Sequence, residues 1–116
     1  MERLAEQKCE ECHASSTPAT DEEIVQFRPQ IPDWEIRTID GIARLSRTYR
    51  LSNFAEALEF TYRIGTLAEA EWHHPVILTE WGKVTVQWWT RKIKGLHRND
   101  FIMAAKTDAL IPQHEK

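Results

Sequence analysis

The chain has 116 residues, of which 41% are hydrophobic and 28% are charged, so it is long enough for one domain with a modest core. Its 15 Lys and Arg residues and 18 Asp and Glu residues give a net charge of −3, which provides no general attraction to nucleic acid or to an anionic membrane. No apolar run approaches the roughly 20 residues that a membrane-spanning helix needs. The amino terminus has no apolar secretory segment, so we expect a cytoplasmic protein with reduced thiols.

The first 19 residues are polar and contain the linker-like run Ser15-Ser16-Thr17-Pro18, so we expect 1–19 to be a flexible extension. Cys9, Cys12 and His13 within it match the attachment pattern of a c-type haem. We reject that interpretation because such attachment normally needs export, and the sequence indicates no second axial ligand. A zinc site would need a fourth ligand beyond these three residues. We therefore expect neither a metal ion nor a cofactor.

A short helix and a hairpin are predicted next. Thr20 and Glu23 match a capping box, which predicts a helix that ends before Pro29. The alternating runs 34–39 and 42–51 flank the turn Asp40-Gly41 and predict a β-hairpin. The turn predicts a register with the pairs Ile39 and Ile42, Thr38 and Ala43, Ile36 and Leu45, and Trp34 and Arg47. The face expected to be buried carries Ile36, Ala43, Leu45, Tyr49 and Leu51.

A long helix is predicted from Ser52 or Asn53 to about Trp72. A glycine inside a helix costs up to about 1 kcal/mol relative to Ala, so we expect another backbone to approach closely at Gly65. Glu69 lies one turn before His73, and its carboxylate can reach an imidazole at the helix end. The apolar stripe expected to be buried recurs at three- and four-residue spacing: Phe54, Ala57, Leu58, Thr61, Tyr62, Gly65 and Ala68.

The rest of the chain predicts a second hairpin, 76–81 and 83–90, and a final helix. Trp88 and Trp89 point to opposite faces of their strand, so both faces should be covered, one of them most simply by a partner subunit. Asp100 suits the first turn of a helix that packs Phe101, Ile102, Ala105 and Leu110 inward and ends at Pro112. The order of elements predicts an α+β fold over residues 20–112, in which a four-stranded antiparallel sheet carries three helices on one face.

The adjacent imidazoles of His73 and His74 are the strongest candidates for chemistry. Pro75 ends the preceding helix, because it has no N–H to donate and disfavours helical geometry at the residue before it. An imidazole with a pKa of about 6.5 gives and takes protons near neutral pH. With Glu69 one turn earlier, the pair indicates an acid–base site. The alternative is an exposed or packed histidine pair without a chemical role.

These residues give the chain a resemblance to the pterin-4a-carbinolamine dehydratase family over about residues 20–111. The resemblance rests on Glu69-x3-His73-His74-Pro75, Trp81, Trp88-Trp89-Thr90, Lys94-Gly95-Leu96 and Asp100-Phe101-Ile102. It implies a cytoplasmic enzyme without metal or organic cofactor. Such an enzyme removes water from a tetrahydropterin with a hydroxyl at carbon 4a and yields quinonoid dihydropterin, in the recycling of tetrahydropterin.

The same resemblance implies the residues of the site. His73 and His74 would act as acid and base, in either assignment, and Glu69 would orient one ring. The implied substrate-binding residues are His73, His74, Pro75, Thr90, Arg91, Lys92, Ile93 and Asp100. One residue departs from the family pattern, which has a third histidine where this chain has Arg91. A guanidinium stays protonated and cannot shuttle a proton, so we expect reduced turnover.

A scaffold is the alternative function. The resemblance extends to non-catalytic proteins of this fold, one of which assists dimerisation of a homeodomain transcription factor, while others assist Rubisco assembly. A protein partner would then replace the pterin as the ligand. Retention of Glu69, His73, His74, Pro75 and Asp100 favours the enzyme. The apolar strand faces and exposed sheet edges predict a homodimer, and the family resemblance extends this to a homotetramer.

Overall fold

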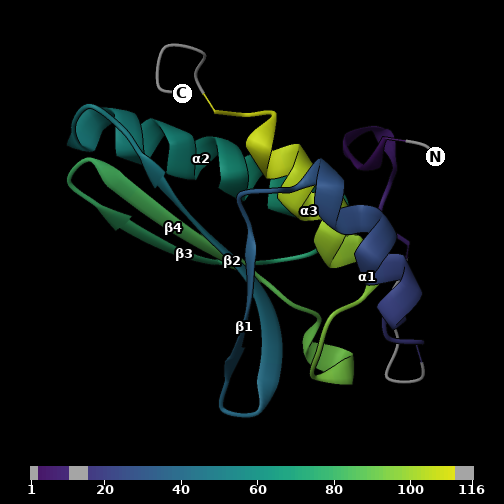
Figure 1. The fold of residues 1–116 in the computed structure, drawn as a ribbon. Helices are drawn as coiled ribbons and strands as arrows, with labels where there is room; N and C mark the ends of the chain where they lie inside the picture. The colour runs from purple at the N-terminus through teal and green to yellow at the C-terminus, as the bar shows by residue number, and fades with distance from the viewer. Residues whose placement is uncertain (1–2, 11–15, 112–116) are drawn as a thin grey trace.

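The computed structural model describes residues 3–10 and 16–111, and within them the elements follow the predicted order (Figure 1). The helices are α1 (Asp21–Phe27), α2 (Phe54–Glu71) and α3 (Arg98–Asp108). The strands are β1 (Glu35–Ile39), β2 (Ile42–Arg50), β3 (Val76–Glu80) and β4 (Lys83–Trp88). Short 3-10 helices are η1 (Leu4–Glu6), η2 (Arg28–Gln30) and η3 (Arg91–Ile93). Cys12, His13 and Pro112 lie outside the described residues.

The strands of the described part form one antiparallel sheet in the order β1-β2-β4-β3, so the two hairpins meet where β2 pairs with β4. Figure 1 shows the three α-helices of this part on one side of the sheet. There α2 packs on β3 and β4, and α3 packs on β2 and β4. The predicted α+β fold is therefore confirmed. None of the helices in residues 3–10 and 16–111 has the length and apolar character needed to cross a membrane.

The first hairpin has the register that its turn predicts. Asp40 and Gly41 both have positive φ, 54° and 78°, as a two-residue turn with the twist of a hairpin requires. The predicted pairing of Trp34 with Arg47 is wrong, because β1 begins at Glu35 and Trp34 precedes it. The other predicted pairs are confirmed: Ile39 with Ile42, Thr38 with Ala43, and Ile36 with Leu45. The predicted capping box of α1, formed by Thr20 and Glu23, is also present.

The core lies between the sheet and the helices, and α2 enters it with a different face from the predicted one. Ala57 and Ala68 are buried as expected, together with Phe60 and Ile64, which the prediction left out. The predicted stripe is wrong at three positions, which are largely exposed: Phe54 (46%), Leu58 (55%) and Tyr62 (71%). Both sets of residues have helical spacing, so contact with β3 and β4 decides which set is buried.

The close backbone approach expected at Gly65 is not found in the described chain. Apart from its chain neighbours and the adjacent backbone of α2 itself, no heavy atom lies within 4 Å of the position that a Cβ would occupy there. By contrast, Gly82 in the second hairpin has φ of 70°, and a Cβ would lie 3.2 Å from the carbonyl oxygen of Leu51. The Leu51 N–H donates to the Gly82 carbonyl at 2.9 Å, so this glycine lets the two hairpins approach each other.

Both tryptophans at the end of β4 are buried, Trp88 completely and Trp89 with 7% of its surface exposed. The guanidinium groups of Arg44 and Arg91 lie 3.9 Å and 4.5 Å from the centroid of the Trp89 ring. Two arginines of the same chain therefore cover the face for which a partner subunit was the expected cover.

The carboxylate of Asp108, the last residue of α3, joins this helix to the first hairpin. Its Oδ1 accepts hydrogen bonds from Trp34 Nε1 at 3.0 Å, from Arg47 at 2.7 Å and from the Tyr49 hydroxyl. Burial raises the pKa of the Tyr49 hydroxyl far above its usual value, and the Asp108 charge beside it raises the pKa further. Tyr49 therefore remains a donor to Asp108, and the C-terminal end of α3 is fixed against β2.

Residues 3–10 pack on the domain, which differs from the flexible extension predicted for 1–19. Leu4 is fully buried, and η1 contacts α3 extensively. The Leu4 N–H also donates to Gln30 Oε1 at 2.7 Å. The segment was predicted to be flexible because its composition is polar, and that prediction overlooked Leu4, which anchors it. The division of the chain into 1–19 and 20–112 stays a prediction.

Candidate active site

His73 and His74 follow α2 directly, as the sequence predicts. The helix ends at Glu71, and Trp72 adopts the left-handed conformation with φ of 55°. The N–H of His73 then donates to a carbonyl of the last helical turn at 3.1 Å, which closes the helix end. Pro75 carries the backbone out of the helix and into β3.

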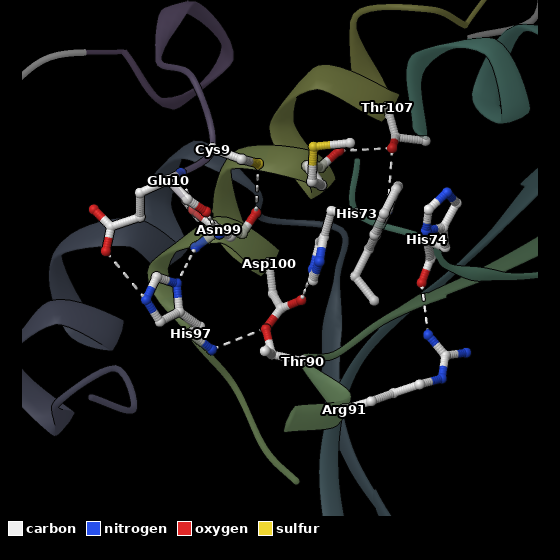
Figure 2. A network of polar contacts seen from close by, with 12 residues as sticks. Cys9, Glu10, His73, His74, Thr90, Arg91, His97, Asn99, Asp100 and Thr107 are labelled. Carbon is white, nitrogen blue, oxygen red and sulfur yellow. Dashed lines mark hydrogen bonds and ion pairs between the residues drawn. The ribbon is translucent and has the colours of Figure 1, made fainter. Parts of the chain in front are cut away.

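His73 is held by a buried carboxylate (Figure 2). Its Nε2 lies 2.7 Å from Asp100 Oδ1, and its ring stacks on Trp88 with centroids 5.6 Å apart. The other oxygen of Asp100 accepts hydrogen bonds from the Thr90 hydroxyl and the His97 N–H, both at 2.8 Å. Asp100 is fully buried, and a carboxylate in its ionised form only accepts hydrogen bonds. With Asp100 ionised, His73 Nε2 is the donor to it, and Nδ1 is the ring nitrogen left for a substrate.

The start of α3 positions Asp100. His97 is the N-cap, and its Nδ1 accepts a hydrogen bond from the Asn99 N–H at 3.0 Å. The His97 N–H in turn donates to the Asp100 carboxylate, which completes a capping box. The predicted role of Asp100 in the first helical turn is confirmed, and the same carboxylate that caps the helix also holds His73.

His74 pairs with the second carboxylate of the site. Its Nε2 lies 2.5 Å from Glu69 Oε2, and its ring lies edge-on to Trp72 with centroids 5.2 Å apart. Glu69 therefore reaches His74, because the chain leaves the helix after Glu71, while His73 turns inward to Asp100. The side chains of His74 and Glu69 are 45% and 67% exposed, so this pair stabilises the fold little and remains accessible.

A cavity of about 600 Å³ lies at this end of the sheet. Of the predicted site residues, its wall includes His73, His74, Thr90, Arg91 and Lys92. Glu69 and Asp100 bond the histidine rings without lining the cavity, and Pro75 and Ile93 are not part of its wall. The structure thus brings the two histidines, their two carboxylates and the segment after β4 together.

Sequence reasoning missed several lining residues: Cys9, Glu10, Glu71, Trp72, Trp89 and Asn99. Trp72 and Asn99 could have been found, because each directly precedes a predicted site residue at a helix end. No sequence pattern places Cys9 and Glu10 at this cavity, because they meet the site across most of the chain: Glu10 and Asn99 are 89 residues apart.

Arg91, which departs from the pattern that the resemblance implies, contacts the main chain of the site. Its guanidinium donates to the His74 carbonyl at 2.9 Å (Figure 2). The same group lies over the Trp89 ring. This places a fixed positive charge on the cavity wall beside His74. In the described part of the chain, no group of three or more His, Cys, Asp or Glu residues is arranged to hold a metal ion.

The fold and the site together define a class of small α+β proteins in which two imidazoles at one helix end are each bonded to a carboxylate. The family model described as pterin 4 alpha carbinolamine dehydratase matches residues 17–110. The chain belongs to this family.

Two relatives share the name "Putative pterin-4-alpha-carbinolamine dehydratase". The protein from Syntrophotalea carbinolica is 72% identical over 111 residues, which cover 96% of this chain and 99% of the relative. The protein from Nitrosococcus oceani is 55% identical over 111 residues, with 96% and 98% of the two chains covered.

Two solved structures share the fold. The transcriptional coactivator/pterin dehydratase from Brucella melitensis has a TM-score of 0.72 at 24% identity and covers 83% of this chain and 100% of its own. A pterin dehydratase-like protein described as a RuBisCO assembly factor in the alpha-carboxysome has a TM-score of 0.57 at 19% identity and covers 67% and 88%. At these identities the likeness shows the fold alone.

Proposed function

We propose that this protein is a 4a-hydroxytetrahydropterin dehydratase. It eliminates water from the 4a-hydroxy adduct and yields quinonoid dihydropterin, and so serves the recycling of tetrahydropterin. The observation that carries this proposal is the pair His73 and His74, which line one cavity while each bonds a carboxylate through Nε2. Family membership supports the substrate class.

The elimination needs one proton donor and one proton acceptor. The bond between carbon 4a and oxygen breaks, the oxygen leaves as water with a proton from the acid, and a base removes a proton from a ring nitrogen. Because Asp100 and Glu69 engage Nε2 of the two rings, Nδ1 of each ring is available for these transfers. The two carboxylates orient the rings and stabilise whichever imidazole is charged.

The remaining predicted residues would bind or frame the pterin. A cavity of about 600 Å³ falls within the range of roughly 300–1,000 Å³ that small-molecule sites occupy. Thr90, Arg91 and Lys92 offer polar groups on its wall. Pro75 and Ile93 lie next in sequence to wall residues, and we propose that they fix the backbone of the site.

The direct test is the decay of a 4a-hydroxytetrahydropterin, generated by a hydroxylase and followed by absorbance with and without the protein. Acceleration above the spontaneous reaction supports the enzyme. No acceleration favours the alternative, a dehydratase-like scaffold with a protein partner. That alternative is supported by one related structure described as an assembly factor for RuBisCO and another described as a transcriptional coactivator. The retained pairs of His73 with Asp100 and His74 with Glu69 favour the enzyme.

Arg91→His is expected to raise turnover by about 10-fold or more. A third imidazole would replace a cation that cannot exchange a proton, and a well-placed acid or base contributes about 10²–10⁴-fold. The measurement is kcat of the native and variant chains in the adduct assay. Lys92→His is the matched control, because it adds an imidazole to the same wall and keeps Arg91. Equal rates for the native chain and Arg91→His would remove Arg91 from the explanation of turnover.

We also propose a cytoplasmic homodimer or homotetramer. Large apolar side chains are exposed on α2 and on the β3 edge of the sheet: Phe54, Leu58, Tyr62, Val76 and Leu78. A second copy would cover these exposed apolar side chains. Sedimentation at micromolar concentration is expected to show a species of at least twice 13.6 kDa, and a monomer would contradict this proposal.

A further inference from the structure

The N-terminal segment 3–10, which we call the strap, joins the catalytic domain at two places. Its far end is anchored by Leu4, which is fully buried and donates its N–H to Gln30 Oε1 at 2.7 Å. Its near end brings Cys9 and Glu10 to the cavity that His73 and His74 line. The proposed chemistry uses no residue of the strap.

Asn99 clamps the near end of the strap. Its side-chain Oδ1 accepts from the Glu10 N–H at 3.0 Å, and its Nδ2 donates to the Glu10 carbonyl at 2.7 Å. Asn99 is 1% exposed, so this pair of hydrogen bonds is shielded from water. The Cys9 N–H donates to Glu71 Oε1 at 3.1 Å, which adds a third anchor.

The Glu10 side chain is fixed as well. Its carboxylate lies 3.3 Å from His97 Nε2 and 3.6 Å from the Arg98 guanidinium. Figure 2 shows Glu10 beside His97 and Asn99, with Asp100 between this group and His73. The strap is therefore an ordered part of the site, because hydrogen bonds fix its main chain and ion pairs fix the Glu10 side chain.

The anchors of the strap are also the helix ends that carry the site. Glu71 is the last residue of α2, two residues before His73, and Asn99 directly precedes Asp100 in α3. The strap thus bridges the two elements that place His73 and its carboxylate. It also supplies a part of the cavity wall that residues 20–112 do not provide.

We propose that Cys9 and Glu10 are specificity-determining residues that contact the bound pterin and set its affinity. The inference rests on the proposed function and deepens it, because it assigns part of the substrate site to a segment outside the predicted domain. The chemistry is carried by the histidines, so loss of the strap weakens binding and leaves the proton transfers in place. The effect belongs in KM and not in kcat.

Leu4→Asp in the full-length chain tests this at a distance from the cavity. A carboxylate is not tolerated at a fully buried apolar site without a partner, so the strap undocks. We expect KM for the 4a-hydroxytetrahydropterin to rise at least about 10-fold while kcat stays within about 2-fold. Val84→Ala is the control for stability, because Val84 is fully buried near the hairpin turn, at the opposite end of β4 from Trp89. It should lower the melting temperature and leave KM unchanged. An unchanged KM in Leu4→Asp, or a fall in kcat alone, would overturn the proposal.

A thiol footprint gives a readout that does not depend on turnover. In Cys12→Ser the half-buried Cys9 is the remaining thiol of the chain, and its alkylation by iodoacetamide can be followed by mass spectrometry. Saturating 7,8-dihydrobiopterin should slow this alkylation at least about 5-fold. Normal turnover without protection would reject the role of the strap alone. Protection without turnover would reject the dehydratase and keep the strap as part of a pterin site, and absence of both would reject both proposals.

Discussion

Asp100→Asn is expected to lower kcat for dehydration by about 100-fold or more. The amide would either turn its NH₂ toward Thr90 and the His97 N–H, which are themselves donors, or turn it toward His73. In the second case His73 Nε2 must accept a hydrogen bond, and the proton moves to Nδ1, the nitrogen that we assign to the substrate. The same change behind the histidine of a serine protease costs on the order of 10⁴-fold.

The measurement is kcat in the adduct assay together with the melting temperature. Glu23→Gln provides a matched control, since it makes the same carboxylate-to-amide change at the same position of the capping box of α1. It should lose a little stability and no activity. If Asp100→Asn kept native turnover, Asp100 would be a helix cap only, and the buried bond to His73 would have no part in the reaction.

Asp108→Ala is expected to lower the free energy of unfolding by about 3 kcal/mol. It leaves the Tyr49 hydroxyl and the Trp34 Nε1–H without their acceptor in the core, at a cost of about 1–3 kcal/mol for each buried group. Both side chains are within 2% of complete burial, whereas the Asp108 side chain is 23% exposed, so the expected loss lies toward the lower end of the summed range.

Urea denaturation at one protein concentration measures this cost, and Asp33→Ala is its control. Asp33 also approaches Arg47, at 3.6 Å, but its side chain is 68% exposed, so its removal should cost less than about 0.5 kcal/mol. Equal costs for the two variants would show that the Asp108 cluster adds no more than a surface ion pair. Because Asp108 ends the helix that starts with the Asp100 turn, we also expect weaker substrate binding in Asp108→Ala.

The features that the sequence predicted correctly are those set by local geometry. The Asp40-Gly41 turn admits one register, so three of the pairs in the first hairpin follow from the turn residues alone. The capping residues Thr20, Glu23 and Asp100 announce helix starts in the same way. Pro75 places the two histidines beyond a helix end, and this position alone was enough to predict the candidate site.

The predictions that were wrong concern features that depend on contacts between distant segments. On α2, Phe60 and Ile64 compete with Leu58 and Tyr62 for the buried face, and helical spacing allows both answers. Packing on β3 and β4 decides between them, and a single sequence carries no information about that contact. The packing of the strap on the domain was not predicted for the same reason, since Glu10 contacts Asn99, which lies 89 residues further along the chain.

The pairing of carboxylates with histidines shows the same limit on a smaller scale. Helical spacing predicted that Glu69 would reach an imidazole, and it left open which one. The backbone leaves the helix at Trp72, and this turn sends His73 inward to Asp100 and leaves His74 beside Glu69. A side-chain direction after a helix end depends on one residue's φ, which composition and periodicity do not contain.

The most direct measurement is the decay of the 4a-hydroxy adduct with the double variant His73→Ala/His74→Ala, compared with the native chain and with buffer alone. The two rings are the proposed source and sink of the protons, so the variant should be folded and should accelerate decay by less than about 1% of the native effect. A folded double variant that removed water as fast as the native chain would contradict this account of the site.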